Sequence, residues 1–152
     1  LLVYLVGKYT SRDIAIRASK YFEVEMDRDS QLPFMIFEGY KMHEDELIKS
    51  VQKFIEENYN KEKTTIEQLS QKASLSRRTF HRRFKKATQL TVVAYIQKVK
   101  VEAAKKLLES TRLSVNEVMY ETGYNDPKSF REVFKKEAGV SPLIYKNKFS
   151  PK

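Results

Sequence analysis

The feature that most constrains this sequence is a repeat in its second half. The segment TIEQLSQKASLSRRTFHRRFKKAT begins at Thr65, and SVNEVMYETGYNDPKSFREVFKKEAG begins at Ser114. The first parts of the copies correspond at an offset of 49 residues and the Phe-x-x-x-Phe-Lys-Lys parts at 50, so one residue is inserted between them. A repeat predicts two copies of one structural unit, which fixes the architecture before any element is assigned.

Each copy opens with the signals of a short helix. Thr65 with Gln68, and Ser114 with Glu117, fit a capping box. In this arrangement the hydroxyl accepts a hydrogen bond from a backbone amide of the first turn, and the longer side chain accepts one from the backbone of the cap. We therefore expect a short helix to start directly after Thr65 and after Ser114.

A tight turn and a second helix follow in each copy. The turn is expected at Ser74 in the first copy and at Gly123 in the second, where glycine suits a strained backbone. The second helix is expected to begin at Ser76 or at Asp126, with Pro127 in a first position where a missing N–H costs nothing. Helix, tight turn and helix form a helix-turn-helix unit.

The segment between the copies, TVVAYIQKVKVEAAKKLLES, predicts one long helix. Its apolar stripe is expected at Val93, Ile96, Val99, Ala103 and Leu107. About 17 residues at ~1.5 Å each give a rod of ~25 Å. The predicted fold is all-α, with two homeodomain-like helix-turn-helix subdomains joined by this central helix. The expected bounds within a domain of residues 41–150 are 65–88 for the first unit, 92–109 for the central helix and 114–138 for the second unit.

Charge is distributed unevenly along the chain. The net charge is +9, but residues 1–60 carry −3 and residues 61–152 carry +12. A basic segment beside a mildly acidic one predicts a domain that binds a polyanion. A surface charge that only keeps the protein in solution is the alternative.

Composition argues against several other classes. The chain has no cysteine, and His43 and His81 are its only histidines, so we expect no metal site, no cofactor and no catalysis. We expect no membrane span, because no apolar run reaches roughly 20 residues. We expect a cytoplasmic protein, with which the lack of cysteine agrees.

The second helix of the first copy has two chemically different faces. Phe80 and Phe84 share one face and are expected in the core. Arg78, His81 and Arg82 line the opposite face near the helix start, where side chains reach base edges in a major groove. An arginine suits this task because its planar group can donate two hydrogen bonds to guanine. A solvated helix face is the alternative for each of them taken singly.

The second copy predicts a similar but less basic face. Lys128, Ser129 and Glu132 are expected to contact bases, with Glu132 either accepting from cytosine or pairing with Lys128 or Arg131. The residues that flank the two faces are expected to contact phosphate. These are Ser76, Arg77, Arg83, Lys85, Lys86, Arg131, Lys135 and Lys136. A nonspecific basic module for nucleic acid and a protein-interaction bundle are the competing readings.

With these motifs, residues 44–149 resemble the DNA-binding domain of AraC/XylS-family transcription regulators. The resemblance is carried by LSRRTFHRRFKKAT, VEAAKKLLE and SVNEVMYETGYNDPKSFREVFKKEAGVSPLIYK. It implies seven helices and two recognition helices in successive major grooves of double-stranded DNA, about one turn or ~34 Å apart. It also implies RNA polymerase as a partner in transcription. The departures from the family pattern are Gln89, Val92, Lys100, Met119, Glu132 and Lys146.

The first 40 residues resemble something else. SRDIAIRASKYFEVEMDRDSQLPF is similar to the C-terminal end of a ThiJ/PfpI-like, amidotransferase-related domain. This resemblance implies that residues 1–40 are the helical tail and linker of an upstream α/β sensor domain. It also implies a longer regulator that forms a homodimer through that domain.

Overall fold

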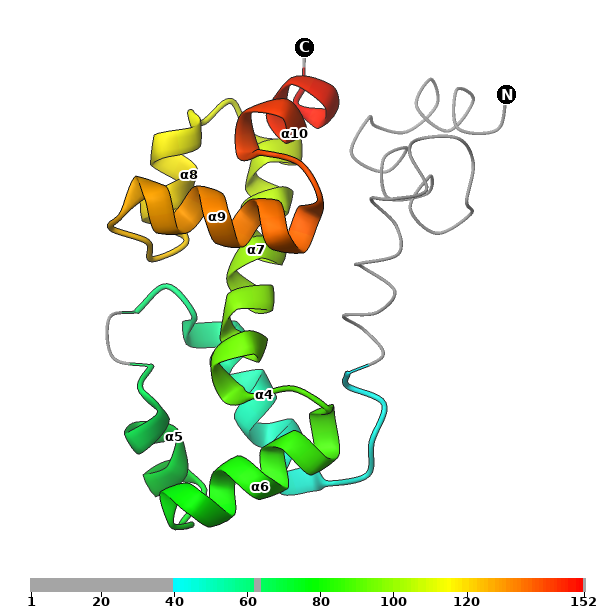
Figure 1. Ribbon diagram of the computed structural model, residues 1–152, viewed down its shortest axis with the longest axis vertical. Helices are drawn as coiled ribbons and strands as arrows, with labels where there is room; N and C mark the ends of the chain where they lie inside the picture. The colour runs from blue at the N-terminus through cyan, green and yellow to red at the C-terminus, as the bar shows by residue number, and fades with distance from the viewer. Residues whose placement is uncertain (1–39, 62–63, 152) are drawn as a thin grey trace.

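The computed structural model describes residues 40–61 and 64–151, and these residues form seven helices and no strand. The expectations for residues 1–39 lie outside the described part. Figure 1 shows the helices as two groups joined by one long helix, α7. The helices are α4 (Glu46–Asn58), α5 (Ile66–Lys72), α6 (Arg77–Thr88), α7 (Val92–Ser110), α8 (Val115–Glu121), α9 (Pro127–Ala138) and α10 (Pro142–Phe149). The prediction of an all-α fold with two helix-turn-helix subdomains and a central helix is confirmed.

Two separate apolar cores hold the two groups together. The first core joins α4, α5, α6 and the N-terminal half of α7, and it ends along α7 at Val99. The second core begins at Val101 and joins the rest of α7 to α8, α9 and α10. Both phenylalanine pairs are buried as expected, since Phe80, Phe84, Phe130 and Phe134 are each no more than 1% exposed.

The apolar stripe predicted for α7 is partly wrong. Val93 is 48% exposed, whereas its neighbour Val92 is buried, together with Tyr95 and Val99. The second buried stripe consists of Val101, Ala104 and Leu108. The side chains of Val99 and Val101 point in directions about 200° apart around the helix axis. The two cores therefore contact nearly opposite sides of α7, and no single stripe describes it.

The predicted caps are present. Capping boxes join Thr65 with Gln68 at α5 and Ser114 with Glu117 at α8. Ser76 caps α6 by accepting from the Thr79 amide. These caps fix where each short helix starts, because they satisfy amides that the helix itself leaves free.

Four left-handed residues mark the turns. Ser74 and Gly123 have φ of 54° and 74° in the turns of the two units. Gln89 and Gly139 have φ of 62° and 78° and end α6 and α9. Gln89, one of the departures from the family pattern, thus ends α6 with the same left-handed backbone with which Gly139 ends α9.

The repeat extends further than the sequence comparison indicated. The rings of Phe84 and Tyr95 lie 5.5 Å apart at 78°, and those of Phe134 and Tyr145 have the same separation and angle. Tyr95 belongs to the start of α7 and Tyr145 to α10. Each unit therefore includes the first turns of a third helix, α7 in one unit and α10 in the other. The tyrosine of this helix packs on the second phenylalanine of the recognition helix.

Candidate nucleic-acid interface

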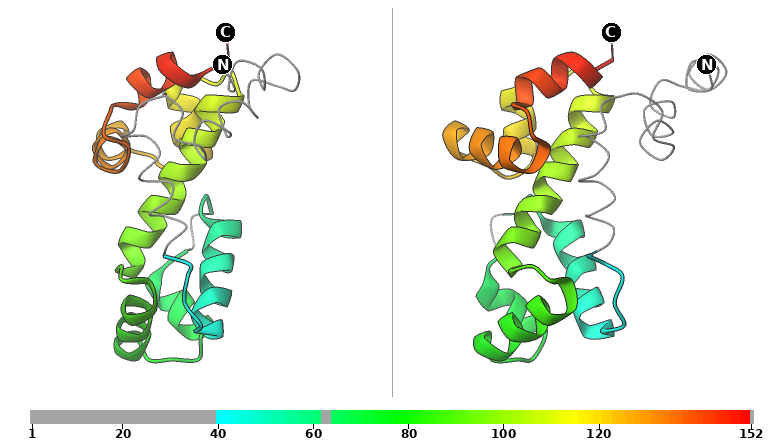
Figure 2. Two further views of the ribbon diagram at one scale, coloured as in Figure 1. Left: turned by 90° about the vertical axis from the view of Figure 1, so that its right-hand side faces the viewer. Right: turned by 45° about the vertical axis from the view of Figure 1, so that its right-hand side comes forward.

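The second helices of the two units, α6 and α9, lie on the same face of the molecule. Figure 1 shows both crossing α7 in the same direction, one below the other. In the turned view of Figure 2 (left panel) both are seen nearly end-on at the left edge. Two nearly parallel helices on one face are the arrangement needed to enter successive grooves of one duplex.

The exposed face of α6 carries the residues expected to read bases. Arg78 and Arg82 are exposed, and His81 is half-buried with its ring centroid 6.3 Å from that of Phe80. Phe80 and Phe84 anchor the opposite face of the helix in the first core. The anchored face orients the helix, and the two arginines are left available for an anionic partner.

Arg83 lies beside this face but has a partner within the protein. Its Nε and one terminal nitrogen donate to the two carboxylate oxygens of Asp45 at 2.7 and 3.0 Å. This bidentate pair holds the pKa of Asp45 below its usual range and raises that of Arg83. Asp45 also caps α4 by accepting from the Ile48 amide. A phosphate contact by Arg83 would have to compete with this pair.

A shallow groove runs between the start of α4 and α6. It has a volume of about 600 Å³, and Arg82, Arg83 and Lys86 line it from α6. His43 lines it from the other side, where its Nδ1 accepts from the Asp45 amide and its Nε2 donates to Gln52 at 2.8 Å. Sequence reasoning assigned no role to His43 or Asp45, because each contact depends on how α4 packs against α6.

The exposed face of α9 is less basic, as expected. Lys128, Ser129 and Glu132 are all exposed, and the Asp126 carboxylate caps the helix by accepting from the Ser129 amide at 2.6 Å. Within the described residues, Glu132 has no cation at ion-pair distance, including Lys128 and Arg131. The pairing considered for Glu132 is therefore not present here.

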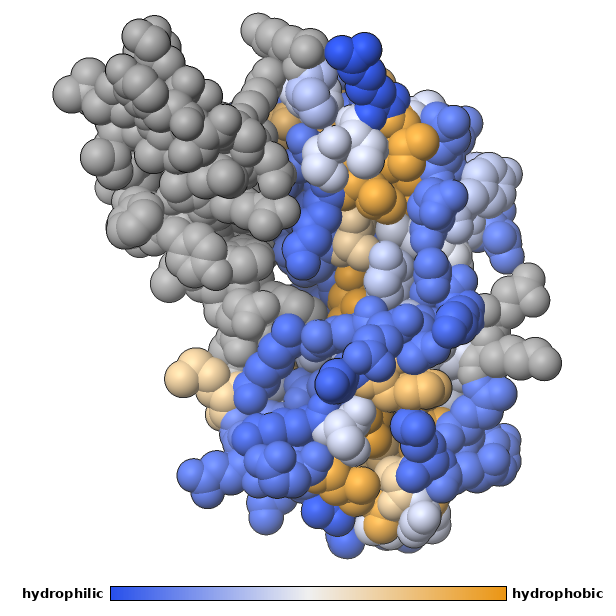
Figure 3. All heavy atoms as spheres, turned by 180° about the vertical axis from the view of Figure 1, so that it is seen from behind, coloured by the Kyte–Doolittle hydropathy of each residue, from blue (hydrophilic) through white to orange (hydrophobic). Residues whose placement is uncertain are grey.

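The residues expected to contact phosphate surround these faces on exposed positions. They are Ser76, Arg77, Arg83, Lys85 and Lys86 at α6, and Arg131, Lys135 and Lys136 on α9. Seen from behind, the opposite side of the molecule carries mostly hydrophilic side chains around a narrow central apolar band (Figure 3). The side opposite α6 and α9 is thus also largely polar.

Two kinds of feature are absent from the described residues. In residues 40–61 and 64–151, no three histidine or acidic side chains group in a way that would hold a metal ion. No helix within the same ranges has the length and apolar character to cross a membrane.

Two helix-turn-helix units on one connecting helix define the class of this protein. Residues 69–148, more than half of the 152-residue chain, match the family described as a helix-turn-helix domain. The chain belongs to this helix-turn-helix family, and its domain is of the AraC type.

Two relatives are regulators by name. The bifunctional transcriptional activator/DNA repair enzyme AdaA of Bacillus subtilis (strain 168) is 34% identical over 106 residues, which are 70% of this chain and 50% of that protein. The uncharacterized HTH-type transcriptional regulator YdiP of Escherichia coli (strain K12) is 32% identical over 112 residues, which are 74% of this chain and 36% of that protein. The chain spans half or less of the length of these two relatives.

Solved structures agree with this assignment. The DNA-binding domain of AdpA, a global transcriptional factor crystallised with a target DNA, matches with a TM-score of 0.62 and 32% identity, over 66% of this chain and 89% of that one. The C-terminal domain of AraT, a response regulator from Geobacillus stearothermophilus, gives a TM-score of 0.67 at 24% identity, over 71% and 89% of the two chains. The second likeness shows the fold alone.

Proposed function

We propose that this chain is the DNA-binding part of a transcription regulator, which recognises specific sequences in double-stranded DNA by inserting α6 and α9 into successive major grooves. The observation that carries the proposal is that both helices lie on one face, each anchored by a buried phenylalanine pair. The relatives named as transcriptional regulators and the AdpA domain in complex with its target DNA support it.

In this proposal the two recognition helices have different roles. Arg78, His81 and Arg82 read bases in one groove, and Lys128, Ser129 and Glu132 read them in the next. The more basic α6 supplies more of the electrostatic affinity. The flanking cations and helix starts hold the phosphates and set the register of the protein on the duplex.

The wider setting of the domain is also proposed. We infer that residues 41–150 form the regulatory DNA-binding domain, and that it acts in the cytoplasm together with RNA polymerase. Residues 1–40 would be the end of an upstream ThiJ/PfpI-like sensor domain, through which a longer protein forms a homodimer. The likeness to AdaA covers half of that protein, so its name gives no reason to expect catalysis by this chain.

Selection of bound duplexes from a random pool tests the proposal directly. We expect two short conserved blocks about one helical turn, ~34 Å, apart, bound at least ~10³-fold more tightly than random duplex. Equal binding of all duplexes would indicate a nonspecific basic module instead. Failure to retain any duplex would favour a protein-interaction bundle.

Matched alanine variants then distinguish residues that contact bases from residues that contact phosphate. Arg82→Ala should cost roughly 1–3 kcal/mol on the selected duplex and relax the base preference at one position. Arg77→Ala should weaken binding to all duplexes about equally and reduce the salt slope by about 1. Affinity measured on selected and random duplexes over a range of salt distinguishes these outcomes. If Arg82→Ala behaved like Arg77→Ala, its role as a base reader would be wrong.

A further inference from the structure

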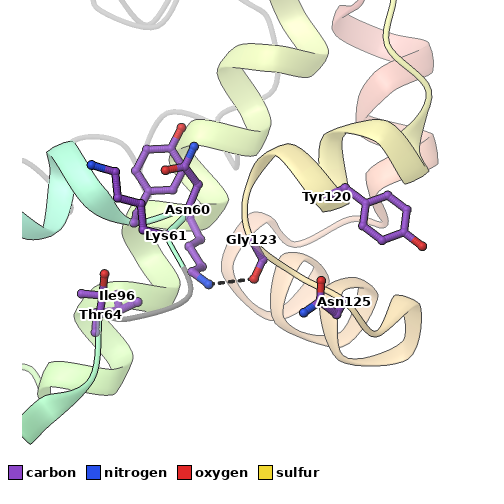
Figure 4. A pocket seen from close by; sticks show the side chains of 9 residues that line it. Asn60, Lys61, Thr64, Ile96, Tyr120, Gly123 and Asn125 are labelled. Carbon is purple, nitrogen blue, oxygen red and sulfur yellow. Dashed lines mark hydrogen bonds between the residues drawn. The ribbon is translucent and has the colours of Figure 1, made fainter.

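Lys100 joins the two units at the boundary between their cores. It lies on α7 between Val99, which ends the first core, and Val101, which begins the second. Its ammonium donates to the backbone oxygen of Gly123 at 3.0 Å and lies 4.9 Å from the centre of the Tyr124 ring. Figure 4 shows this hydrogen bond crossing the space between the units. The contact therefore connects the central helix to the turn of the second unit.

Gly123 also touches the first unit directly. A Cβ atom on Gly123 would lie 3.1 Å from the Cα of Asn60 and 3.2 Å from its backbone oxygen. Asn60 lies just after the end of α4, in the first unit. The turn of one unit thus rests on the turn of the other, and a Cβ at Gly123 would force Asn60 to move by a few tenths of an ångström. Its φ of 74° also favours glycine over residues that carry a Cβ.

A second contact braces the units on another side of α7. Lys98 of α7 pairs with Glu137 of α9 at 2.5 Å, with side chains 22% and 12% exposed. The same ammonium lies 5.6 Å from the centre of the Tyr40 ring, which packs against the first core. An ion pair this sheltered from water is screened less than a surface pair. It therefore restrains rotation of α9 about α7.

The surroundings of Lys100 are unusual for a lysine. It lines a cavity of about 530 Å³ between the units, together with Tyr59, Asn60, Ile96 and Asn125. Burial lowers its pKa, because a charged group loses hydration there. A long flexible cation in such a place needs a fixed acceptor, and the Gly123 oxygen supplies it.

We propose that Lys100, Gly123 and Asn60 form a clamp that fixes the distance and rotation between α6 and α9, so that the protein accepts one spacing between its two DNA blocks. This inference rests on the proposed function. Each base pair inserted between the blocks moves the second one by about 3.4 Å and turns it by about 34°. A rigid protein cannot follow this change, whereas a loosened one can.

Two pairs of variants isolate the clamp. Lys100→Met removes the ammonium but keeps the length of the side chain, and Lys106→Met makes the same change at an exposed position of α7. Gly123→Ala and Gly139→Ala both add a Cβ at a left-handed residue, but the one at Gly139 meets nothing within 4 Å. The difference within each pair therefore reports the contact between the units. If Gly123→Ala did not fold, Lys100→Met would carry the test.

The first measurement needs no DNA. The chain has no cysteine, so Lys86→Cys and Lys136→Cys introduce two spin labels at exposed positions of α6 and α9. Pulsed electron paramagnetic resonance then gives the distribution of distances between the recognition helices. We expect a narrow distribution with the clamp intact and with Lys106→Met, and a broader one with Lys100→Met. An unchanged distribution with Lys100→Met would overturn the clamp.

The second measurement uses the selected duplex with zero, one or two base pairs inserted between its blocks. The unchanged protein should lose about tenfold or more in affinity on the first insertion, since α9 then misses its bases. With Lys100→Met the loss should fall to threefold or less. An equal loss of affinity at every spacing would mean that Lys100 only stabilises the fold, and would overturn the proposal. If selection gave no two-block duplex, the proposed function would fail, while the label distances would still decide on the clamp.

Discussion

At the scale of single residues, Gln89 is the most instructive departure from the family pattern. It ends α6 with φ of 62°, where Gly139 ends α9 with φ of 78°. A residue with a side chain is strained in this region by roughly 1–2 kcal/mol, and glycine loses part of that advantage through its greater freedom in the unfolded chain. We expect Gln89→Gly to raise the free energy of unfolding by about 1 kcal/mol. Urea unfolding measures this, and Gly139→Gln should change it in the opposite direction.

We expect the substitution of tyrosine by phenylalanine to have different effects on stability at Tyr145 and at Tyr124. The Tyr145 hydroxyl donates to Glu109, which is only 5% exposed. The Tyr124 hydroxyl is buried and has no hydrogen-bond partner within the described residues. Tyr145→Phe should therefore cost about 1–3 kcal/mol, whereas Tyr124→Phe should be neutral or stabilising. Thermal and urea unfolding of both variants test this, and an equal loss in both would contradict it.

At the scale of elements, the start of α4 places an acidic residue against the basic face of α6. Asp45 occupies both side-chain nitrogens of Arg83 that face it, and it adds a negative charge beside Arg82 and Lys86. Asparagine at position 45 keeps a capping oxygen but removes the charge. We therefore expect the charge of Asp45 to lower the affinity for phosphate next to α6.

We expect Asp45→Asn to raise the affinity for selected and random duplexes alike, and to increase the salt slope by about 1 because Arg83 becomes available. Filter binding over a range of salt measures both quantities. The double variant Asp45→Asn with Arg83→Ala should lose most of the gain. A gain that survived in the double variant would show that Arg83 does not contact phosphate.

The elements also show what local sequence can predict. Caps, turns and phenylalanine pairs depend on residues a few positions apart, so the two units were predictable from their own sequences. The stripe on α7 was not, because Val92 and Val93 both fit helical spacing and only the packing of two cores selects between them. The equivalence of Tyr95 and Tyr145 was not predicted either, because it becomes visible only when each tyrosine packs on its phenylalanine.

The candidate site was predictable in part. Exposure of Arg78, Arg82 and Lys128 follows from the burial of the phenylalanines on the opposite helix face. The contacts from Arg83 to Asp45 and from Lys100 to Gly123 join residues 38 and 23 positions apart in sequence. No local pattern encodes such pairs, and they arise only when helices pack. The roles assigned to the site residues at DNA stay predictions.

At the scale of the whole molecule, buried ionisable groups predict how stability changes at high pH. Burial raises the pKa of Tyr59 and Tyr145 above 10.0 and that of Tyr124 to about 12. The folded state favours the neutral form of these tyrosines. Their contribution to the free energy of unfolding is therefore complete below pH 10 and is lost as pH rises above that value. The effect of Lys100 on the free energy of unfolding has the opposite sign. Its pKa is lowered in the folded state, so the folded protein releases this proton at a lower pH than the unfolded chain does, and the folded state gains stability as pH rises.

Three tyrosines lower the stability as pH rises and one lysine raises it, so we expect the free energy of unfolding to fall between pH 10 and pH 12. Urea unfolding at steps of pH measures the slope. Tyr124→Phe should reduce it, because one group that titrates is removed. A stability that rose over this range would mean that the lysine dominates.

The meeting of two cores at one residue of α7 has an evolutionary consequence. Val99 belongs entirely to one half of the protein and Val101 to the other. Recombination between the genes of two relatives at codon 100 would leave both halves internally intact. A new pair of binding preferences would then arise in one genetic event, provided that three contacts across the crossover match: Lys100 with Gly123, Gly123 with Asn60, and Lys98 with Glu137.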